Sequence, residues 1–370
     1  MTKVYTWSLA TRLFHVLLIL FILISYIVSD FDRLLDWHVA FGYGAGVLFL
    51  FRIVWGFMDV KYSRFKDFNF KTKDLIDYLT NLFTNKKSYI SHNPASSWAI
   101  VAMIVLGLLS VISGALAYGT QEGMGVFSFL NKTLFRDMEF FKEIHEFIVN
   151  AFIFVIFAHI AGVLLDKIIH KTDTLQSMIN GYKKGAETNL KLTLFQKIFA
   201  IFWIMTPILL IIYMLSNPSN ILMKDSNKRV DYKSENTLFY EECSSCHIIY
   251  PPFLLPKKSW TKMMENLENH FGDDASLEEE DKNLIKNYLV KNSSETSTKE
   301  SAYHITKSIK NSDIIAITKT DYWKKRHKKI DKEIFKSKEV SKISNCKACH
   351  KNFEQGLLND RDISIPKERR

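Results

Sequence analysis

The sequence predicts an all-α protein: a transmembrane helical bundle followed by a small, mostly helical, two-lobed domain. Two observations indicate this fold class. Five apolar runs approach the ~20 residues that a helix needs to cross a bilayer, and all of them lie within the first 216 of 370 residues. The remaining residues are polar and rich in lysine, and they show no strand-like alternation.

The five runs are predicted as membrane helices. The first resembles a secretory signal, but it is long for one and lacks a clear small-x-small cleavage site, so we expect an uncleaved signal that stays in the membrane. The runs are Trp7–Val28, Trp37–Phe57, Trp98–Tyr118, Phe147–Leu165 and Ile198–Leu215.

The basic residues near the membrane segments predict the orientation. Fifteen Lys and Arg lie at the N-terminus and in the second and fourth connections, against four in the other two connections. Because basic residues stay on the cytoplasmic side, the N-terminus is expected to be cytoplasmic. Five crossings then place residues 217–370 outside.

Charge and cysteine content exclude some classes of function. The net charge of +10 divides evenly, +5 before residue 217 and +5 from there on. No basic stripe alternates with aromatic residues, so we expect no nucleic-acid partner. All four cysteines lie in two Cys-x-x-Cys-His strings, which leaves none for a structural disulfide.

Composition predicts three parts: 1–190 as a four-helix membrane domain, 191–236 as a fifth helix with a polar tether, and 237–370 as the outer domain. In the outer domain, Ser276 and Glu279 fit a capping box that opens a helix running to about Val290. The polar stretch 291–301 is predicted as a hinge between two lobes, each with one Cys-x-x-Cys-His string.

These two strings are the strongest chemical signal. Cys-x-x-Cys-His is the attachment signature of c-type haem, in which both thiols add to haem vinyl groups and the histidine ligates the iron. A zinc site needs a matching ligand pair nearby, and a redox dithiol needs a βαβ setting. We therefore expect two covalent haems c, at Cys243, Cys246 and His247 and at Cys346, Cys349 and His350.

Each haem c needs a second axial ligand. We expect His270 for the first haem and His327 for the second, with His304 as the reserve candidate for either. Met263 and Met264 lie on an amphipathic stretch, where packing in the core is the more frequent use of methionine.

Histidines also occur in the membrane segments. His145 and His159 stand fourteen residues apart, which puts both on one helix face roughly 21 Å apart. Interface histidines that only bond to neighbouring helices are the alternative. Ionisable residues at this depth usually serve a cofactor or a charge path, and His38 and His15 lie at matching depths. Two haems b are thus predicted, an outer one on His38 and His145 and an inner one on His15 and His159.

Other residues near these histidines admit two interpretations. Gly42, Gly44 and Gly46 would let a porphyrin approach the backbone or would simply pack helices. Arg52 would pair with a haem propionate or extend to the headgroups. His92 and His170 fall in cytoplasmic connections and are expected to be solvated.

Two family resemblances follow from these residues. Residues 5–185 resemble the bacterial cytochrome b561 family, including the b-type subunits of nickel–iron hydrogenases. That resemblance implies that the four matching histidines ligate two haems b. It rests on Thr11–His15, Trp37–His38 with Gly42, Arg52, Trp55–Phe57, His92–Ala95, His145–Glu146 and His159–Val163.

The outer domain resembles the dihaem cytochrome c family. The resemblance rests on Cys243–His247, Tyr250–Pro252, Leu255–Pro256, Ser259–Trp260, His270–Gly272, Ile305–Thr306, Trp323, His327 and Cys346–His350. At His304 the family pattern has an arginine. Helix five is an addition to the usual four-helix b unit.

The sequence therefore predicts a tetrahaem electron carrier in a bacterial inner membrane. It would exchange electrons between membrane quinone and a periplasmic cytochrome or reductase. Because the outer domain is rich in lysine, this periplasmic partner is expected to be acidic. As an enzyme it would be a quinol:cytochrome c-type oxidoreductase. The alternatives are a haem enzyme with a five-coordinate haem c that acts on a small ligand, and a membrane anchor of a separate reductase or hydrogenase.

Overall fold

The computed structural model describes residues 3–83, 89, 92–133, 139–184, 188–309 and 314–366. Its contacts divide the chain into two compact units. The membrane unit comprises Met1–Ala117 and Phe140–Asn220, and the C-terminal unit comprises Tyr118–Glu139 and Ile221–Arg370. The connection between the third and fourth membrane helices thus belongs to the C-terminal unit. The predicted all-α fold class is confirmed.

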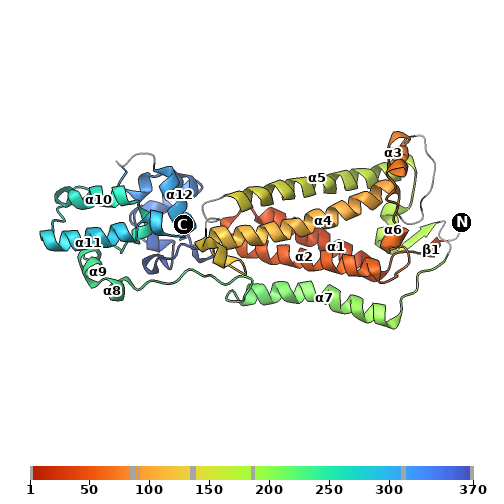
Figure 1. The fold of residues 1–370 in the computed structure, drawn as a ribbon, viewed down its shortest axis with the longest axis horizontal. Coiled ribbons are helices and arrows are strands. Elements are labelled where there is room, and N and C mark those ends of the chain that lie inside the picture. The colour runs from red at the N-terminus through yellow and green to blue at the C-terminus, as the bar shows by residue number, and fades with distance from the viewer. Residues whose placement is uncertain are drawn as a thin grey trace. The chain divides into compact units, whose positions relative to one another are not determined.

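Five long helices form the membrane unit (Figure 1). Each is long and apolar enough to span a bilayer, and each matches one of the five predicted runs to within several residues. They are α1 (Leu9–Val28), α2 (Leu35–Phe57), α4 (Pro94–Ala117), α5 (Phe140–Ile169) and α7 (Leu194–Ser216).

Local chemistry fixes where two of these helices begin. Ser8 caps α1, since its side chain accepts a hydrogen bond from the Thr11 amide at 3.1 Å. Thr193 and Gln196 form a reciprocal capping box at the start of α7. Both caps accept hydrogen bonds from backbone amides that have no partner within the first helical turn.

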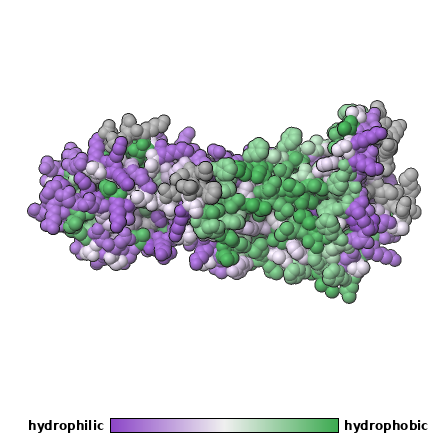
Figure 2. Space-filling view, viewed as in Figure 1, coloured by the Kyte–Doolittle hydropathy of each residue, from purple (hydrophilic) through white to green (hydrophobic). Residues whose placement is uncertain are grey.

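Helix α2 is the centre of the membrane unit. It packs against α1, α4 and α7, and Leu48, Phe51 and Trp55 on it are completely buried. Helix α5 packs mainly on α4, and among the described residues it has no extensive contact with α1. The apolar side chains that face outward from these helices form a broad hydrophobic band (Figure 2). This band is the surface expected against lipid.

Short elements close the cytoplasmic end predicted for this unit. Strands β1 (Lys3–Tyr5) and β2 (Tyr182–Lys184) pair antiparallel, and α3 (Thr72–Thr80) and α6 (Thr174–Asn180) complete the set. The two strands were not predicted from the sequence. Three-residue strands almost 180 residues apart carry too little alternation to be recognised.

The C-terminal unit is built from short helices. Two buried clusters form its lobes, one around Ile249 and Trp260 and one around Phe253 and Phe353. Its α-helices are α8 (Tyr232–Glu235), α9 (Thr237–Ser244), α10 (Lys257–Glu265), α11 (Glu279–Lys291), α12 (Glu300–Ser308) and α13 (Asp321–His327).

Two local predictions in this unit are wrong. Helix α11 begins at Glu279 after Glu278, and the predicted capping box is absent because the amide and hydroxyl of Ser276 both bond to the Asp274 carboxylate. The stretch 291–301 is packed and is not a loose hinge. Ser293 and Ser294 in it are buried, and the Ser294 amide donates to the Leu255 carbonyl at 3.0 Å.

Candidate functional site

Helices α2 and α5 bring the rings of His38 and His145 close together, nearly perpendicular to each other. Their ring centres lie 6.1 Å apart with the planes at 84°. Rings packed edge to face also reach this distance. Two imidazole nitrogens, each about 2 Å from one shared metal ion, hold their ring centres roughly 6 Å apart. The spacing therefore fits an iron held between the two rings.

The hydrogen bonds of both rings leave the correct nitrogen free. His38 Nδ1 donates to the Ser25 carbonyl at 2.9 Å, and Ser25 Oγ in turn donates to the His38 carbonyl. His145 Nδ1 lies 3.1 Å from Ser113 Oγ, whose own proton goes to the Leu109 carbonyl. Among the described residues, no hydrogen bond engages Nε2 of either ring, as expected of a metal ligand oriented through its other nitrogen.

A glycine on α4 makes room for the His145 ring. A Cβ at Gly114 would lie 2.9 Å from the Cε1 atom of that ring. The other glycines singled out in the sequence pack helices. A Cβ would lie 2.7 Å from Ile211 of α7 at Gly44, and 3.2 Å from Val111 of α4 at Gly46. Gly42 has only Ser25 Oγ nearby, at 4.0 Å.

The second predicted pair is His15 on α1 and His159 on α5. Both side chains are half-buried. Since α1 and α5 have no extensive contact among the described residues, the two helices do not close around each other at this level. Such a separation suits a flat cofactor held from both sides.

Arg52 lies buried in the same unit. Its guanidinium stands 4.8 Å from the Phe65 ring centre and 5.7 Å from that of Phe68. The side chain is only 7 % exposed, and Nη1 has no hydrogen-bond partner in the described part of the chain. Arg52 therefore does not extend to the headgroups. A buried cation that lacks a partner requires an anionic or accepting group.

His92 and His170 are not solvated, contrary to expectation. The His92 ring packs against Phe68 and Trp7, at 4.5 and 5.4 Å, and burial lowers its pKa to about 3. His170 bonds through one nitrogen to Asp166 and through the other to the Leu82 carbonyl. Aromatic residues distant in sequence enclose His92, which a linear motif does not reveal.

In the C-terminal unit, His247 faces His270. Their ring centres also lie 6.1 Å apart, with planes at 25°. His247 Nδ1 bonds to the Ile248 carbonyl at 2.7 Å, which again leaves Nε2 free. A tight turn presents His270, because Phe271 and Gly272 after it both have positive φ.

His327 and His350 form the third pair with measured geometry. Their ring centres are again 6.1 Å apart, with planes at 58°. His327 Nδ1 bonds to the Trp323 carbonyl one turn back on α13, and the Trp323 ring stacks on the imidazole at 4.3 Å. Burial lowers the pKa of His327, and lowers that of His350 to about 4, so both rings are neutral as metal ligands must be.

The four cysteines are free thiols and form no disulfides. Burial raises the pKa of Cys243 and of Cys346 to about 12, so neither favours the thiolate that zinc requires. Among the described residues, no group of three or more His, Cys, Asp or Glu side chains is arranged to hold a metal ion. The cysteines and histidine of each Cys-x-x-Cys-His string therefore fit covalent attachment of a haem c.

Models of two known protein families match the chain, one in the membrane unit and one in the C-terminal unit. The model of prokaryotic cytochrome b561 matches residues 6–181, and the model of dihaem cytochrome c matches residues 239–358. The chain is a cytochrome b561 joined to a dihaem cytochrome c. Haem b and haem c are thus its cofactors, electron transfer is its chemistry, and the b561 domain lies in a membrane. Comparison with curated proteins gives no match.

Solved structures resemble the dihaem cytochrome c domain. A diheme cytochrome c from Rhodobacter sphaeroides is 34 % identical, and the match covers 35 % of this chain and 99 % of that chain at a TM-score of 0.31. A diheme cytochrome type c from Shewanella baltica OS155 is 30 % identical, with 36 % and 94 % covered and a TM-score of 0.29.

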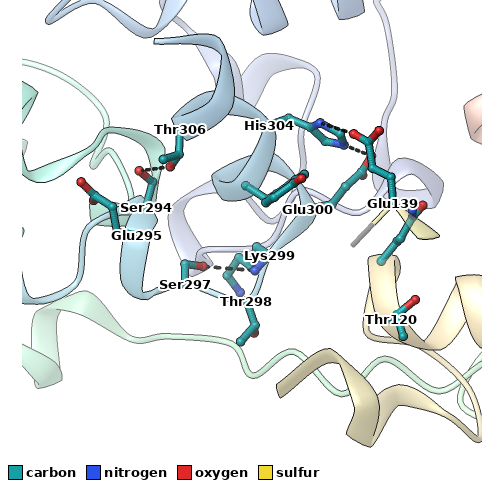
Figure 3. A pocket seen from close by; sticks show the side chains of 12 residues that line it. Thr120, Glu139, Ser294, Glu295, Ser297, Thr298, Lys299, Glu300, His304 and Thr306 are labelled. Atoms are coloured by element: carbon teal, nitrogen blue, oxygen red, sulfur yellow. Dashed lines mark hydrogen bonds and ion pairs between the residues drawn. The ribbon is translucent and has the colours of Figure 1, made fainter. Parts of the chain in front are cut away.

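His304, the reserve ligand, lies elsewhere in the dihaem cytochrome c domain. It stands on α12 at a cavity of about 270 Å³ (Figure 3). Its nitrogens face two carboxylates, Glu300 at 3.5 Å and Glu139 at 3.9 Å, and its ring stacks on Tyr322 at 5.2 Å. Both nitrogens therefore point at acidic side chains.

Tyr250 connects the two haem c sites. This role of Tyr250 was not predicted from the sequence. Its ring lies 5.1 Å from that of His247 and 5.7 Å from that of Phe353 in the second lobe. Its hydroxyl donates to the Ser344 carbonyl, two residues before Cys346. The supporting serines Ser25 and Ser113 were also missed, because no spacing relates them to the histidines that they orient.

Proposed function

We propose that this protein carries electrons between membrane quinone and a periplasmic redox partner through two haems b and two haems c. The observation that carries the proposal is the recurrence of one geometry. Three histidine pairs, each between separate segments, have ring centres at 6.1 Å. Two of the pairs include the histidine of a Cys-x-x-Cys-His string, which is the expected axial ligand of a haem c.

Three of the proposed ligand pairs follow from that geometry, and the fourth, His15 with His159, follows from the matching depths of the two residues in the membrane. His38 and His145 hold the outer haem b, and His15 and His159 hold the inner one. His247 with His270, and His350 with His327, hold the two haems c, which the cysteines of each string bind covalently. His304 is not a ligand, because both of its nitrogens face carboxylates.

The residues of the chain perform distinct tasks in this function. The bound haems supply one-electron chemistry. Ser25 and Ser113 orient the outer b ligands, and Arg52 offers its unpartnered Nη1 to a haem propionate. Paired histidines leave no open coordination position, which favours electron transfer over reaction of a small ligand at iron.

The orientation in the membrane is also part of the proposal. Fifteen basic residues against four support a cytoplasmic N-terminus and a periplasmic C-terminal domain in the bacterial inner membrane. The proposed parts are 1–190 for the b561 domain, 191–236 for the fifth helix and tether, and 237–370 for the dihaem domain.

Spectroscopy and reduction by quinol test the function. Pyridine haemochrome analysis of the purified protein is expected to give two haems b and two haems c per chain. A membrane quinol should reduce both types, and carbon monoxide should not bind the reduced protein. A chain without haem b contradicts the proposal. Carbon monoxide binding at one haem c supports the small-ligand enzyme instead, and a stoichiometric catalytic subunit that co-purifies supports the anchor.

A further inference from the structure

Charge is distributed unevenly over the dihaem cytochrome c domain. Residues 324–351, here called the basic segment, hold eleven Lys and Arg against three Asp and Glu, a net charge of +8. Residues 237–291, the acidic segment, hold six against ten, a net charge of −4. All of residues 217–370 together carry only +5, so the basic segment accounts for the net positive charge of this part of the chain.

The cations of the basic segment are available to a partner. Ten of the eleven are exposed, and Arg326 is half-buried against Asp360. Lys324, Lys336 and Lys347 make ion pairs with nearby carboxylates. Within the described residues, no ion pair involves the other seven, which are Lys325, Lys328, Lys329, Lys332, Lys338, Lys342 and Lys351.

This segment contains the residues of the second haem c site. It begins in α13, which carries His327, and it ends just after the string of Cys346 to His350. Lys347 lies inside that string and Lys351 follows it directly. An electron passes efficiently only to a partner that approaches this site closely, so the partner must enter the field of these cations.

We propose that the basic segment is the docking surface for an acidic redox protein, which exchanges electrons at the second haem c site. This inference rests on the proposed function. A positive patch steers an acidic protein and fixes its orientation, and it raises the association rate more than the final affinity. The acidic segment at the first site repels the same partner, so the two sites are not equivalent.

The segment does not have the features of a lipid-binding element. An interfacial helix presents a face of large apolar side chains to the acyl region. In the basic segment, the single strongly exposed large apolar side chain among the described residues is Ile343, at 48 %. Its one α-helix, α13, has seven residues.

Binding of two probes that differ only in charge tests the proposal. The probes are a basic monohaem cytochrome c and the same protein with its lysines succinylated. The full chain, in nanodiscs of neutral phosphatidylcholine and with both proteins oxidised, is titrated with each probe by calorimetry. The acidic probe should bind more tightly, and its Kd should rise steeply with ionic strength.

Two matched triple variants locate the surface. Replacing Lys332, Lys338 and Lys342 by Glu should weaken binding of the acidic probe by about tenfold or more. The control replaces Lys257, Lys258 and Lys291, which are exposed in or near the acidic segment, and makes the same change in net charge. Equal weakening by the control, or equal affinity for the two probes, overturns the proposal.

Two further measurements distinguish protein docking from lipid binding and from a failure of the quinone function. In nanodiscs with one-third phosphatidylglycerol, loss of the dependence on Lys332, Lys338 and Lys342 would mean that lipid covers the segment, which also overturns the proposal. Reduction of the haems c by quinol is recorded in the same samples. If reduction by quinol fails while selective binding remains, the proposed quinone function is wrong but the docking surface stands.

Discussion

The ring of Tyr250 lies 5.1 Å from the ring of His247, and its hydroxyl reaches the carbonyl of Ser344 beside the second attachment string. One side chain thus contacts the proposed axial ligand of the first haem c and the backbone that leads to the second attachment string. Because Tyr250 is half-buried between the lobes, we infer that it sets their spacing.

Replacing Tyr250 separates the role of its hydroxyl from that of its ring. Tyr250→Phe should lose one hydrogen bond and about 1 kcal/mol of stability. It should keep the rate of electron exchange between the haems c. Tyr250→Leu should also lose the ring contacts and slow that exchange. Thermal unfolding and pulse radiolysis measure the two effects, and equal exchange rates in both variants would refute a spacing role for the ring.

Removal of His145 should eliminate one specific haem. His145→Ala is expected to lose the outer haem b and to stop the reduction of the haems c by quinol, while both haems c remain attached. Ser113→Ala should retain the haem. Its midpoint potential should rise, because a ligand that donates no hydrogen bond is less electron-rich. Haem analysis and a redox titration measure these outcomes. A His145→Ala protein with full haem b content would show that the pairing with His38 is wrong.

The distal ligands of the haems c can be distinguished by carbon monoxide. His304→Ala should leave both haems c six-coordinate, because this histidine faces Glu139 and Glu300. His270→Ala and His327→Ala should each open one coordination position. The optical spectrum of the reduced protein under carbon monoxide reports the change. Binding in the His304 variant but not in the His270 variant would reverse the assignment at the first haem.

The parts of this protein that depend on local sequence were predictable. Unbroken apolar runs gave the membrane helices, and fixed spacing in Cys-x-x-Cys-His gave the haem c strings. Matching depths of His38 and His145 predicted a pair that the structure places close together, although ligation itself stays a prediction.

Features that depend on tertiary contacts were not predictable. Ser276 matched a capping box, but the Asp274 carboxylate binds its amide and hydroxyl. His92 lies in a basic connection that looks solvated, yet Trp7 and Phe68 enclose it. Hydropathy along the chain does not register a ring buried by residues distant in sequence.

Arg52 should raise the midpoint potential of the inner haem b. A buried guanidinium stabilises a propionate, and its positive charge disfavours the more positive, oxidised iron. Arg52→Gln is therefore expected to lower this potential in a redox titration. Arg64→Gln is the matched control, because Arg64 is already paired with Asp59 and Asp67. Equal shifts in the two variants would mean that general charge near the membrane is responsible.

Two glycines near the haem b ligands should respond differently to a single methyl group. At Gly114 a Cβ would lie 2.9 Å from the ring of His145, whereas at Gly162 nothing lies within 4 Å. Gly114→Ala should displace the imidazole and weaken or abolish binding of the outer haem b. Gly162→Ala, three residues from His159, should keep both haems b and should add some helix stability, since Ala is favoured over Gly in a helix by about 1 kcal/mol. Haem b content per chain, with the haems c as the internal standard, measures the difference. Retention of the full content in Gly114→Ala would mean that His145 does not need the position that the structure gives it.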